Sequence, residues 1–366
     1  MKILQVCSAK TLGGGEQHVI DLTRALIERG HELHLAVRRN SSLCQALLEV
    51  PVEWHELPLR NALDIFSAKQ IAAIIKENKI DVVHAHVARD YPIAGIATKL
   101  SPAKLFLTRH HFNPIKSNFL YRWAIGTAIN LIAVSASVKA ELVKAFPALA
   151  KRTVIIPNWV DSDGIATLGK AEAREALGIK RKFAIGMIGE ISPVKNQELF
   201  VKAAHDLMTV RIFTEIDFFI IGEASSQNQN YQQYINSLLN QFNSDIKGQV
   251  KLTGKIADIK TKLAAFDIIL IPSINEGFSL VLVEAMAAGV AVIAANVGAM
   301  AEIVQNEKTG LLIEPQNSQA IAQAIKRLLE NDELRKKLGT AASEQVKAQF
   351  DRNQVIDQIE KLYAGT

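Results

Sequence analysis

Short apolar segments alternate with longer amphipathic segments along almost the whole chain, and this alternation strongly constrains the fold. The apolar segments are rich in β-branched residues, which is typical of strands. We expect strands at residues 3–7, 32–37, 52–57, 82–86, 104–108, 131–135 and 153–157, and then at 183–189, 217–223, 250–254, 268–273, 291–295 and 310–315. Such β-α alternation predicts an α/β protein with parallel sheets and helices on both faces.

The length of 366 residues is too great for one ordinary core, and two domains of roughly 150–200 residues are expected. A polar segment at 158–182 separates the two sets of strands and is the expected linker. We therefore predict an N-terminal Rossmann-like domain over 1–165 and a second one over 166–345. The helix over 346–366 is a candidate for packing back on the first domain.

Composition excludes a long disordered chain, because 49% of the residues are hydrophobic and 22% are charged. The net charge of +5 is mild and identifies no partner. Cys7 lies inside an expected strand, so we predict a buried free thiol, which suits a reducing cytosol. We find no secretory signal before residue 3 and no apolar run of about 18 residues, the length that a spanning helix needs.

The segment EGFSLVLVEAMAAG (276–289) places two carboxylates at the two ends of an apolar stretch. We expect Ser279 to begin a helix there and Gly289 to end it. Glu284 then lies in an almost wholly apolar helix, where a carboxylate is costly unless it is paired or bound to a ligand. The spacing alone is equally compatible with a structural hydrogen bond from Glu284 to a nearby loop.

The spacing of Glu276 and Glu284 restricts what the pair can do. Eight residues of helix rise by about 12 Å, whereas a glycosidase carboxylate pair lies roughly 5–9.5 Å apart. Two carboxylates that bind separate hydroxyl groups of an elongated ligand fit better. Between them, a helix start offers backbone N–H groups to a phosphate, at Gly277, Phe278, Ser279 and Leu280. Hydroxyl, phosphate, hydroxyl is the layout of a nucleotide sugar.

The segment EGFSLVLVEAMAAGVAVIA resembles the donor-site signature of family 4 retaining glycosyltransferases, the group 1 type with the GT-B fold. Further resemblances are GGGEQHVIDLTRALIERGHEL to the family's first loop and helix, TRHH to its histidine loop, VIIPNWVD to its pre-linker strand and GEISPVKNQELF to its phosphate-clamp loop. The resemblance implies two Rossmann-like domains that face each other across a cleft. It also implies that Glu276 contacts the donor sugar and Glu284 the ribose.

Two loops are candidates for donor binding. The run that contains Gly14 and Gly15 follows the first strand and lets backbone N–H groups approach a ligand closely, although a tight loop without a ligand is the alternative. It lacks the G-x-G-x-x-G pattern, which makes a dehydrogenase the weaker interpretation. In ISPVKNQELF we predict Ser192 as the N-cap and Pro193 as the first helical residue.

That placement puts Lys195 in a first helical turn, where a cation is disfavoured by the helix dipole unless it faces an anion. The resemblance assigns Lys195 to the donor diphosphate, and a solvated lysine is the alternative. Glu190 is the main departure from the family, which commonly has arginine there. An anion near a diphosphate is unfavourable. Four alternatives follow: Glu190 turns away, another base compensates for it, the donor is a different one, or donor binding is impaired. Trp159 and Ala291 are lesser departures from the usual glycine and proline.

Histidines gather at the ends of two expected strands. The resemblance selects His110 as the residue near the reacting sugar, where an imidazole can donate to a hydroxyl group or stabilise developing charge. We take His86, Arg109 and His111 as acceptor-side candidates and His84 as a core residue. The D-x-D pattern at 161–163 lies in the linker rather than after a buried strand. We therefore reject it as a metal site and expect metal-independent chemistry with no cofactor.

Residues 91–140 contain no acidic residue. Aromatic residues alternate there with the bases Lys99, Lys104, Arg109, Lys116, Arg122 and Lys139. This mixture fits a protein that lies on an anionic bilayer, and it also fits single-stranded nucleic acid or an ordinary domain surface. We favour the membrane surface and assign no nucleic-acid partner.

The resemblance implies a hexosyltransferase that moves a sugar from a UDP- or GDP-sugar to a glycan or lipid-linked acceptor, with retained anomeric configuration. Envelope polysaccharide or lipopolysaccharide biosynthesis is the expected role, in the cytoplasm or on the inner face of the cytoplasmic membrane. A donor phosphate oxygen would help to deprotonate the acceptor, and the protein would position the substrates and stabilise charge. The alternatives are a non-catalytic sugar-nucleotide-binding protein, motivated by Glu190, and a nucleotide-sugar epimerase. Oligomeric state is not encoded in any pattern that we recognise.

Overall fold

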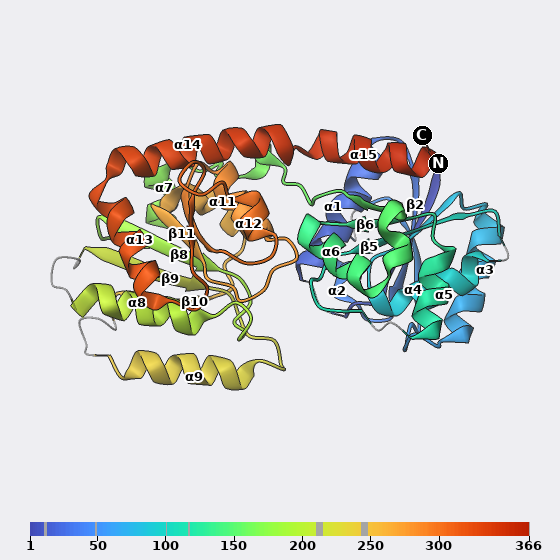
Figure 1. The fold of residues 1–366 in the computed structure, drawn as a ribbon, viewed down its shortest axis with the longest axis horizontal. Coiled ribbons are helices and arrows are strands. Elements are labelled where there is room, and N and C mark those ends of the chain that lie inside the picture. Colours follow the sequence, from blue (N-terminus) through green and yellow to red (C-terminus); the bar gives the residue numbers. More distant parts are fainter. Residues whose placement is uncertain are drawn as a thin grey trace. The chain divides into compact units, whose positions relative to one another are not determined.

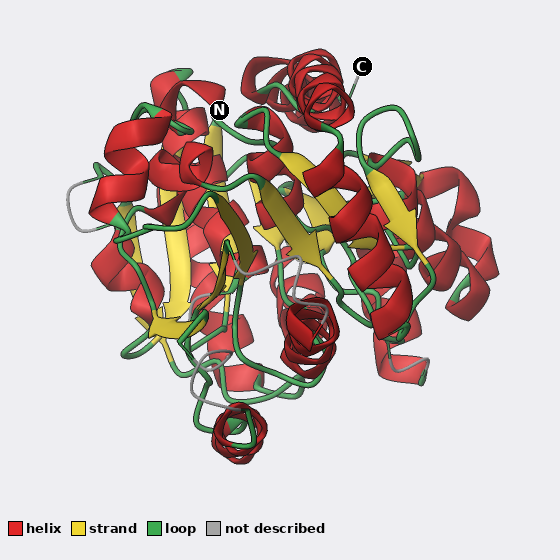
Figure 2. Cartoon of the chain, turned by 90° about the vertical axis from the view of Figure 1, so that its left-hand side faces the viewer, coloured by secondary structure: helices red, strands yellow, loops and turns green. Residues whose placement is uncertain are grey.

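The computed structural model describes residues 1–10, 13–47, 50–99, 101–115, 118–209, 215–242 and 248–365. The chain divides into two compact units. Unit 1 comprises Met1–Asn158 and Asn353–Thr366, and unit 2 comprises Trp159–Arg352. Each unit contains one parallel sheet with helices on both faces (Figures 1 and 2), and all thirteen expected strands are present. The predicted α/β fold of two Rossmann-like domains is thus confirmed.

Unit 1 has a seven-stranded sheet in the order β3-β2-β1-β4-β5-β6-β7. Helices α3, α4 and α5 pack side by side, as Figure 1 shows. The strands are β1 Lys2–Cys7, β2 Glu32–Arg38, β3 Glu53–Leu57, β4 Val82–Ala85, β5 Lys104–Arg109, β6 Asn130–Ala133 and β7 Thr153–Ile155. The helices are α1 Gly14–Glu28, α2 Ser42–Ala46, α3 Ile65–Asn78, η1 Ala88–Asp90, α4 Tyr91–Thr98, α5 Phe119–Thr127, α6 Ala136–Ala145, η2 Pro147–Arg152 and α15 Arg352–Ala364.

Unit 2 has a six-stranded sheet in the order β10-β9-β8-β11-β12-β13. The strands are β8 Phe183–Ile188, β9 Ile216–Ile221, β10 Val250–Gly254, β11 Ile268–Ile271, β12 Ala291–Ala295 and β13 Leu311–Ile313. The helices are η3 Ser162–Gly164, α7 Lys170–Ala176, α8 Gln197–Thr209, α9 Gln229–Asn240, η4 Ile259–Ala265, α11 Leu280–Ala287, α12 Met300–Ile303, α13 Ser318–Glu330 and α14 Asp332–Gln349.

Alternate residues of the unit 2 strands enter two different cores, one on each face of the sheet. On β11, Ile268 and Leu270 pack in the cluster that includes residues of α8 and α13. Ile269 and Ile271 pack in the cluster that includes residues of α11 and α14. Because neighbouring residues of a strand point to opposite faces, a sheet covered on both sides needs continuously apolar strands. This explains the apolar runs in the sequence.

Strand order reverses once in each sheet, between β1 and β4 in unit 1 and between β8 and β11 in unit 2. At such a switch point the loops leave in opposite directions from adjacent strands, which opens a crevice at the carboxyl ends of the strands. Ligands of open α/β sheets bind at this position. The loops after these four strands are therefore the first places to look for a site.

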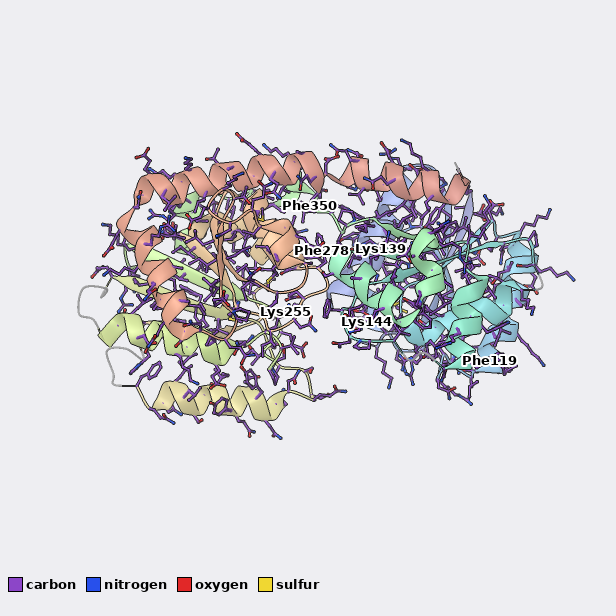
Figure 3. The ribbon with its side chains drawn as sticks, in the orientation of Figure 1. Phe119, Lys139, Lys144, Lys255, Phe278 and Phe350 are labelled. Carbon is purple, nitrogen blue, oxygen red and sulfur yellow. The ribbon has the colours of Figure 1, made fainter. Side chains whose placement is uncertain are left out.

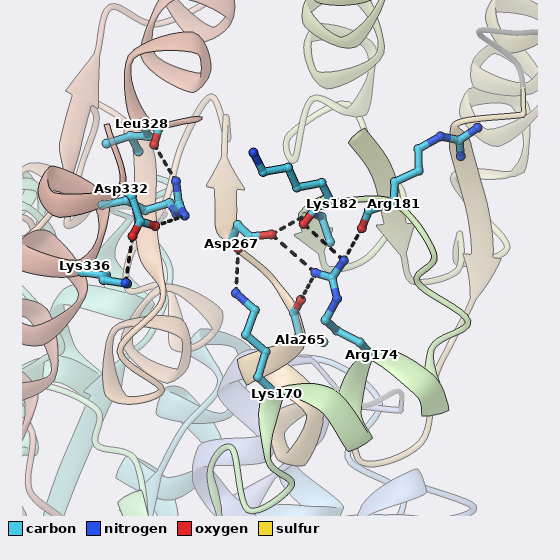
Figure 4. Close-up of polar contacts among 11 residues, drawn as sticks. Lys170, Arg174, Arg181, Lys182, Ala265, Asp267, Leu328, Asp332 and Lys336 are labelled. Atoms are coloured by element: carbon cyan, nitrogen blue, oxygen red, sulfur yellow. Dashed lines mark hydrogen bonds and ion pairs between the residues drawn. The ribbon is translucent and has the colours of Figure 1, made fainter. Parts of the chain in front are cut away.

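At the amino ends of the central strands of the unit 2 sheet, opposite the switch-point loops, lies a network of paired charges (Figure 4). The buried carboxylate of Asp267 accepts from Lys170 Nζ at 2.7 Å and from the Ala184 N–H at 2.9 Å. Arg174 lies 3.5 Å from the same carboxylate. These contacts attach α7 to the amino ends of β8 and β11.

The last helix, α15, belongs to unit 1. Tyr363 is 1% exposed, and its hydroxyl lies 2.6 Å from His84 Nδ1. Its ring packs beside Phe106 with 5.0 Å between the centroids. Near the middle of α15, Asp357 forms an ion pair with Arg29 at 2.9 Å. These contacts fix α15 to the sheet of unit 1.

Candidate active site

In unit 2 an ion pair joins the two loops at the switch point. Lys195 Nζ, on the loop after β8, lies 2.5 Å from Glu276 Oε1 on the loop after β11. Ser273 Oγ donates to the same carboxylate oxygen at 2.9 Å. Glu276 is only 9% exposed, so its charge is stabilised mainly by these two partners. The sequence suggested both residues separately, but nothing in it indicated that they pair.

The loop after β12 holds the backbone of Glu276. The Ala299 N–H donates to the Glu276 carbonyl oxygen at 3.1 Å. Gly298, with φ of +49°, comes so close that a Cβ there would lie 2.3 Å from the same oxygen. Only glycine fits both the backbone conformation and the contact. The loops after three adjacent strands, β8, β11 and β12, thus determine the position of Glu276.

The structure corrects the expected start of the helix after β8. Helix α8 begins at Gln197 rather than at Pro193, so Ser192 is not its N-cap and Lys195 is not in its first turn. Asn196 has φ of +63°, a left-handed conformation that interrupts a helix. The N–H groups of Lys195 and Asn196 both donate to the Ser192 carbonyl oxygen, at 3.0 and 3.2 Å. Lys195 therefore lies in a tight turn, from which it reaches Glu276.

Glu190, the main departure from the family pattern, has a partner of its own. Its side chain is exposed, and Oε1 accepts from Asn228 Nδ2 at 2.9 Å. Its carbonyl oxygen accepts from Gln197 Nε2 at 2.9 Å. The carboxylate is thus hydrogen-bonded to the residue that precedes α9. This contact fits one of the expected alternatives, in which Glu190 turns away from the donor phosphates.

Helix α11 starts at Leu280 and follows Ser279, as predicted, and Gly289 follows its end with φ of +69°. The Ser279 side chain makes no capping hydrogen bond to the helix. Phe278 packs edge-on against Phe350, with the ring centroids 5.8 Å apart (Figure 3). Glu284 is partly exposed on the second turn of α11. The first turn therefore lacks its usual side-chain cap, which suits an anion bound by backbone N–H groups.

In unit 1 the glycine run opens α1 beside a histidine. The Gly13 N–H donates to Glu16 Oε2 at 2.9 Å and closes the turn. A Cβ at Gly15 would lie 3.4 Å from the His110 ring, so the backbone comes close to this imidazole. A Cβ at Gly14 would meet nothing within 4 Å among the described atoms. The structure thus brings together the predicted glycine loop and His110.

His110 belongs to a buried group of histidines at the carboxyl ends of β4 and β5. His110 Nε2 lies 3.4 Å from His86 Nδ1, and the His18 ring lies 4.8 Å from the His110 ring between centroids. Burial lowers the pKa of His18 to about 3 and holds the pKa values of His86 and His110 well below the usual range. His110 is therefore a neutral imidazole, suited to hydrogen bonding rather than to carrying charge.

His84 is a core residue, as predicted, and is 0% exposed. Its Nε2 lies 2.6 Å from Thr108 Oγ1. His111 is exposed, whereas Arg109 is buried and donates to the Asn113 carbonyl oxygen. Of the acceptor-side candidates, His86 therefore lies next to His110, whereas the Arg109 side chain is hydrogen-bonded within the loop that follows β5.

Asp90 is a further candidate residue that the sequence patterns did not indicate. It is 0% exposed at the unit 1 switch point, and Oδ2 accepts from the Ser8 N–H at 2.8 Å. Within the described part of the chain, Oδ1 has no hydrogen-bond partner. Burial raises the pKa of this carboxyl to about 6. The signal that could have revealed it is an acid in the short loop after a buried strand, in HVARDYP.

Two observations bear on metals. Asp161 accepts from the Asp163 N–H at 3.3 Å and thus closes a local turn. The donor atoms of His18, His86 and His110 lie within 4.8 Å of one another, which is compatible with a metal ion or with a network of neutral imidazoles. Metal independence stays a prediction.

Comparison with known proteins identifies the class to which this fold and site belong. A glycosyltransferase of Rickettsia africae has a TM-score of 0.88 and 24% identity, covering 99% of this chain and 97% of that one. Anabaena HepE in complex with UDP has a TM-score of 0.87 and 23% identity, with full coverage of both chains. These similarities establish the GT-B fold.

Two family models then identify the family. "Glycosyltransferase Family 4" matches residues 12–163, and "Glycosyl transferases group 1" matches 169–345. N-acetyl-alpha-D-glucosaminyl L-malate synthase of Bacillus anthracis is 28% identical over 96% of this chain and 94% of its own. An Escherichia coli galactosyltransferase that acts on GlcNAc-diphosphoundecaprenol is 26% identical over 82% of this chain and 79% of its own. The chain belongs to the group 1, family 4 glycosyltransferases, as its motifs indicated, and is a glycosyltransferase.

None of the helices in the described ranges is both long and apolar enough to cross a membrane.

Proposed function

We propose that the chain transfers a hexose from a UDP-sugar, with retained anomeric configuration, to a lipid-linked glycan acceptor in envelope polysaccharide or lipopolysaccharide biosynthesis. Unit 2 binds the donor and unit 1 the acceptor. A UDP donor is supported by the E. coli relative, which uses UDP-Gal, and by the UDP complex of HepE. A GDP-sugar is the other nucleotide donor to test.

The ion pair between Lys195 and Glu276 carries this proposal. It places a cation and a carboxylate at the switch point, where nucleotides bind in related folds. A diphosphate is a partner for Lys195, and sugar hydroxyl groups are partners for Glu276. The first turn of α11, with Gly277, Ser279 and Leu280, offers N–H groups to the diphosphate, and Glu284 binds the ribose. Neutral His110 donates to the sugar, and no metal takes part.

The acceptor proposal rests on the surface of residues 91–140. Phe119, at the start of α5, is 84% exposed and projects away from the helix (Figure 3). Arg122, also on α5, and Lys99 are exposed, and Lys99 Nζ lies 5.4 Å from the ring centroid of Trp123 on α5. An exposed aromatic side chain close to exposed bases favours an anionic bilayer surface. Lys104 donates to the Tyr363 carbonyl oxygen instead, and Lys116 lies outside the described residues.

Titration with UDP, GDP, ADP and CMP, followed by the corresponding sugars, tests the donor. Transfer to a diphosphoundecaprenol-linked sugar in anionic vesicles, compared with transfer to L-malate and inositol phosphate, tests the acceptor. We expect UDP binding and product on the lipid. Transfer only to a small soluble acceptor would refute the lipid-linked assignment. Binding with neither transfer nor donor hydrolysis would indicate a non-catalytic protein, and release of an epimer without acceptor would indicate an epimerase.

A further inference from the structure

A second cluster of histidines lies on the edge of the unit 1 sheet, near the amino ends of its strands. His34 on β2 is 0% exposed, and His55 on the edge strand β3 is partly exposed. In the register of the two parallel strands, His34 pairs with Glu53 and Ala36 pairs with His55. Paired residues and residues two apart point to the same face. His34, Glu53 and His55 therefore share one face, at the opposite end of the strands from His86 and His110.

The donor atoms of these three residues converge. His34 Nδ1 lies 3.2 Å from His55 Nε2 and 3.4 Å from Glu53 Oε2. His55 Nε2 lies 3.7 Å from Glu53 Oε1. Ligand atoms bound to one tetrahedral zinc ion at 2.0–2.1 Å must lie about 3.3 Å from one another. The two histidine nitrogens, 3.2 Å apart, and the 3.4 Å from His34 Nδ1 to Glu53 Oε2 are close to this value. His55 Nε2 lies slightly further, 3.7 Å, from the other oxygen of the same carboxylate, so small side-chain adjustments are enough to admit an ion.

The other ring nitrogen of His34 is oriented by a carboxylate. His34 Nε2 lies 3.2 Å from Glu32 Oε1, and this oxygen also accepts from Lys2 Nζ at 2.9 Å. A proton on Nε2 shared with Glu32 leaves the lone pair of Nδ1 directed toward His55 and Glu53. Metal-binding histidines usually have such a carboxylate partner, which sets the tautomer and increases the basicity of the ligand.

Access and charge also suit a cation. The Glu53 side chain is 56% exposed, so the cluster opens to solvent and retains a position for a water ligand. Glu77 is the further charged group that acts on His55, and it is an exposed carboxylate. Lys2 is paired with Glu32 rather than directed at the three ligands. The surroundings are therefore anionic overall.

We propose that His34 Nδ1, His55 Nε2 and the Glu53 carboxylate form a site for a divalent transition-metal ion, with Zn²⁺ as the natural occupant. Two nitrogen ligands and one carboxylate suit zinc and exclude magnesium and calcium, which take oxygen ligands. The ion ties the edge strand β3 to β2 and has no part in the proposed sugar transfer.

The test is titration of the full chain, free of any affinity tag, with Zn²⁺ alone. We expect one equivalent to bind at this site and the bound protein to unfold at a higher temperature. With Co²⁺ as the probe, a tetrahedral absorption spectrum is expected. His55→Ala, on the exposed side of the cluster, should abolish both signals, and Glu53→Gln should weaken them. Glu32→Gln should raise the dissociation constant about 10- to 100-fold, as expected for the partner of a metal-binding histidine.

Two matched variants locate the ion. His205→Ala, on α8 of unit 2, should leave Zn²⁺ binding unchanged. His86→Ala removes the other histidine group and should also leave this equivalent in place. Retention of full Zn²⁺ affinity in folded His55→Ala would overturn the proposal, as would loss of binding in His86→Ala alone. Absence of Zn²⁺ binding by the unmodified chain would overturn it directly.

Discussion

Lys195 Nζ lies 2.5 Å from Glu276 Oε1, so the cation proposed for the diphosphate is paired with the carboxylate proposed for the sugar. A bound diphosphate has to compete with Glu276 for Lys195. The two residues should therefore affect nucleotide binding in opposite directions, although they belong to one ion pair.

Lys195→Ala should weaken UDP binding by at least ~1.5 kcal/mol, because a charge-assisted hydrogen bond is lost. Glu276→Gln should leave UDP affinity unchanged or increase it, because the competing charge is removed, yet it should abolish transfer. Isothermal titration and initial rates measure both effects. Lys202→Ala is the matched control, since it removes a surface pair with Glu198 of the same length, 2.5 Å. An equal loss of UDP affinity in Lys195→Ala and Glu276→Gln would contradict the proposed division of roles.

Glu190→Arg should maintain or strengthen affinity for the nucleoside diphosphate, because it replaces a negative charge with a positive one in the loop proposed to bind the phosphates. The rate with the full donor separates two roles. An unchanged transfer rate means that Glu190 has no role beyond its hydrogen bond to Asn228. Loss of transfer means that Glu190 acts on the donor sugar. Asn228→Ala, which removes the contact of 2.9 Å, is the companion variant. Weaker nucleotide binding by a folded Glu190→Arg protein would show that the phosphate site is wrongly placed.

Glu284→Gln should reduce nucleotide affinity by roughly 1.5–3 kcal/mol, since a neutral amide retains the shape but loses charge-assisted hydrogen bonds to the ribose. Titration with UDP measures the change, and circular dichroism checks the fold. Glu172→Gln, at an exposed position on α7, is the control and should bind normally. Unaltered affinity in Glu284→Gln would rule out the ribose role.

His110→Ala should abolish transfer with little effect on nucleotide affinity, because its contact strengthens as charge develops on the sugar. The neighbouring, exposed His111 supplies the control, and His111→Ala should retain most of the rate. Near-normal kcat in His110→Ala together with a loss in His111→Ala would reverse the assignment.

Asp90→Asn should change how stability depends on pH. Burial raises the pKa of Asp90 from 3.8 to about 6, so in that interval the folded chain holds a proton that the unfolded chain has released. The free energy of unfolding of the unmodified chain, relative to Asp90→Asn, should fall by roughly 2.4 kcal/mol from pH 4 to pH 7. Urea unfolding at several pH values measures this difference. A constant difference across the range would mean that the carboxyl titrates normally in the folded chain.

Local pattern alone predicted a large part of this protein. All thirteen strands, the two parallel sheets, the cap position of Ser279 and the glycine just after α11, Gly289, follow from periodicity and from the preferences of single residues. The family motifs added the GT-B fold and the transferase class. These features depend on neighbours in sequence, which is why a sequence can reveal them.

Tertiary structure decided which side chains meet. Lys195 and Glu276 are 81 residues apart, and their loops become neighbours only because β8 and β11 are adjacent at the switch point. His34 and His55 converge through the register of two parallel strands, and Asp90 acquires its raised pKa through burial. The left-handed conformation of Asn196 overrode the helix signal of Ser192 and Pro193. Strand order, register and burial arise from packing over the whole sheet, so no local segment of the sequence encodes them.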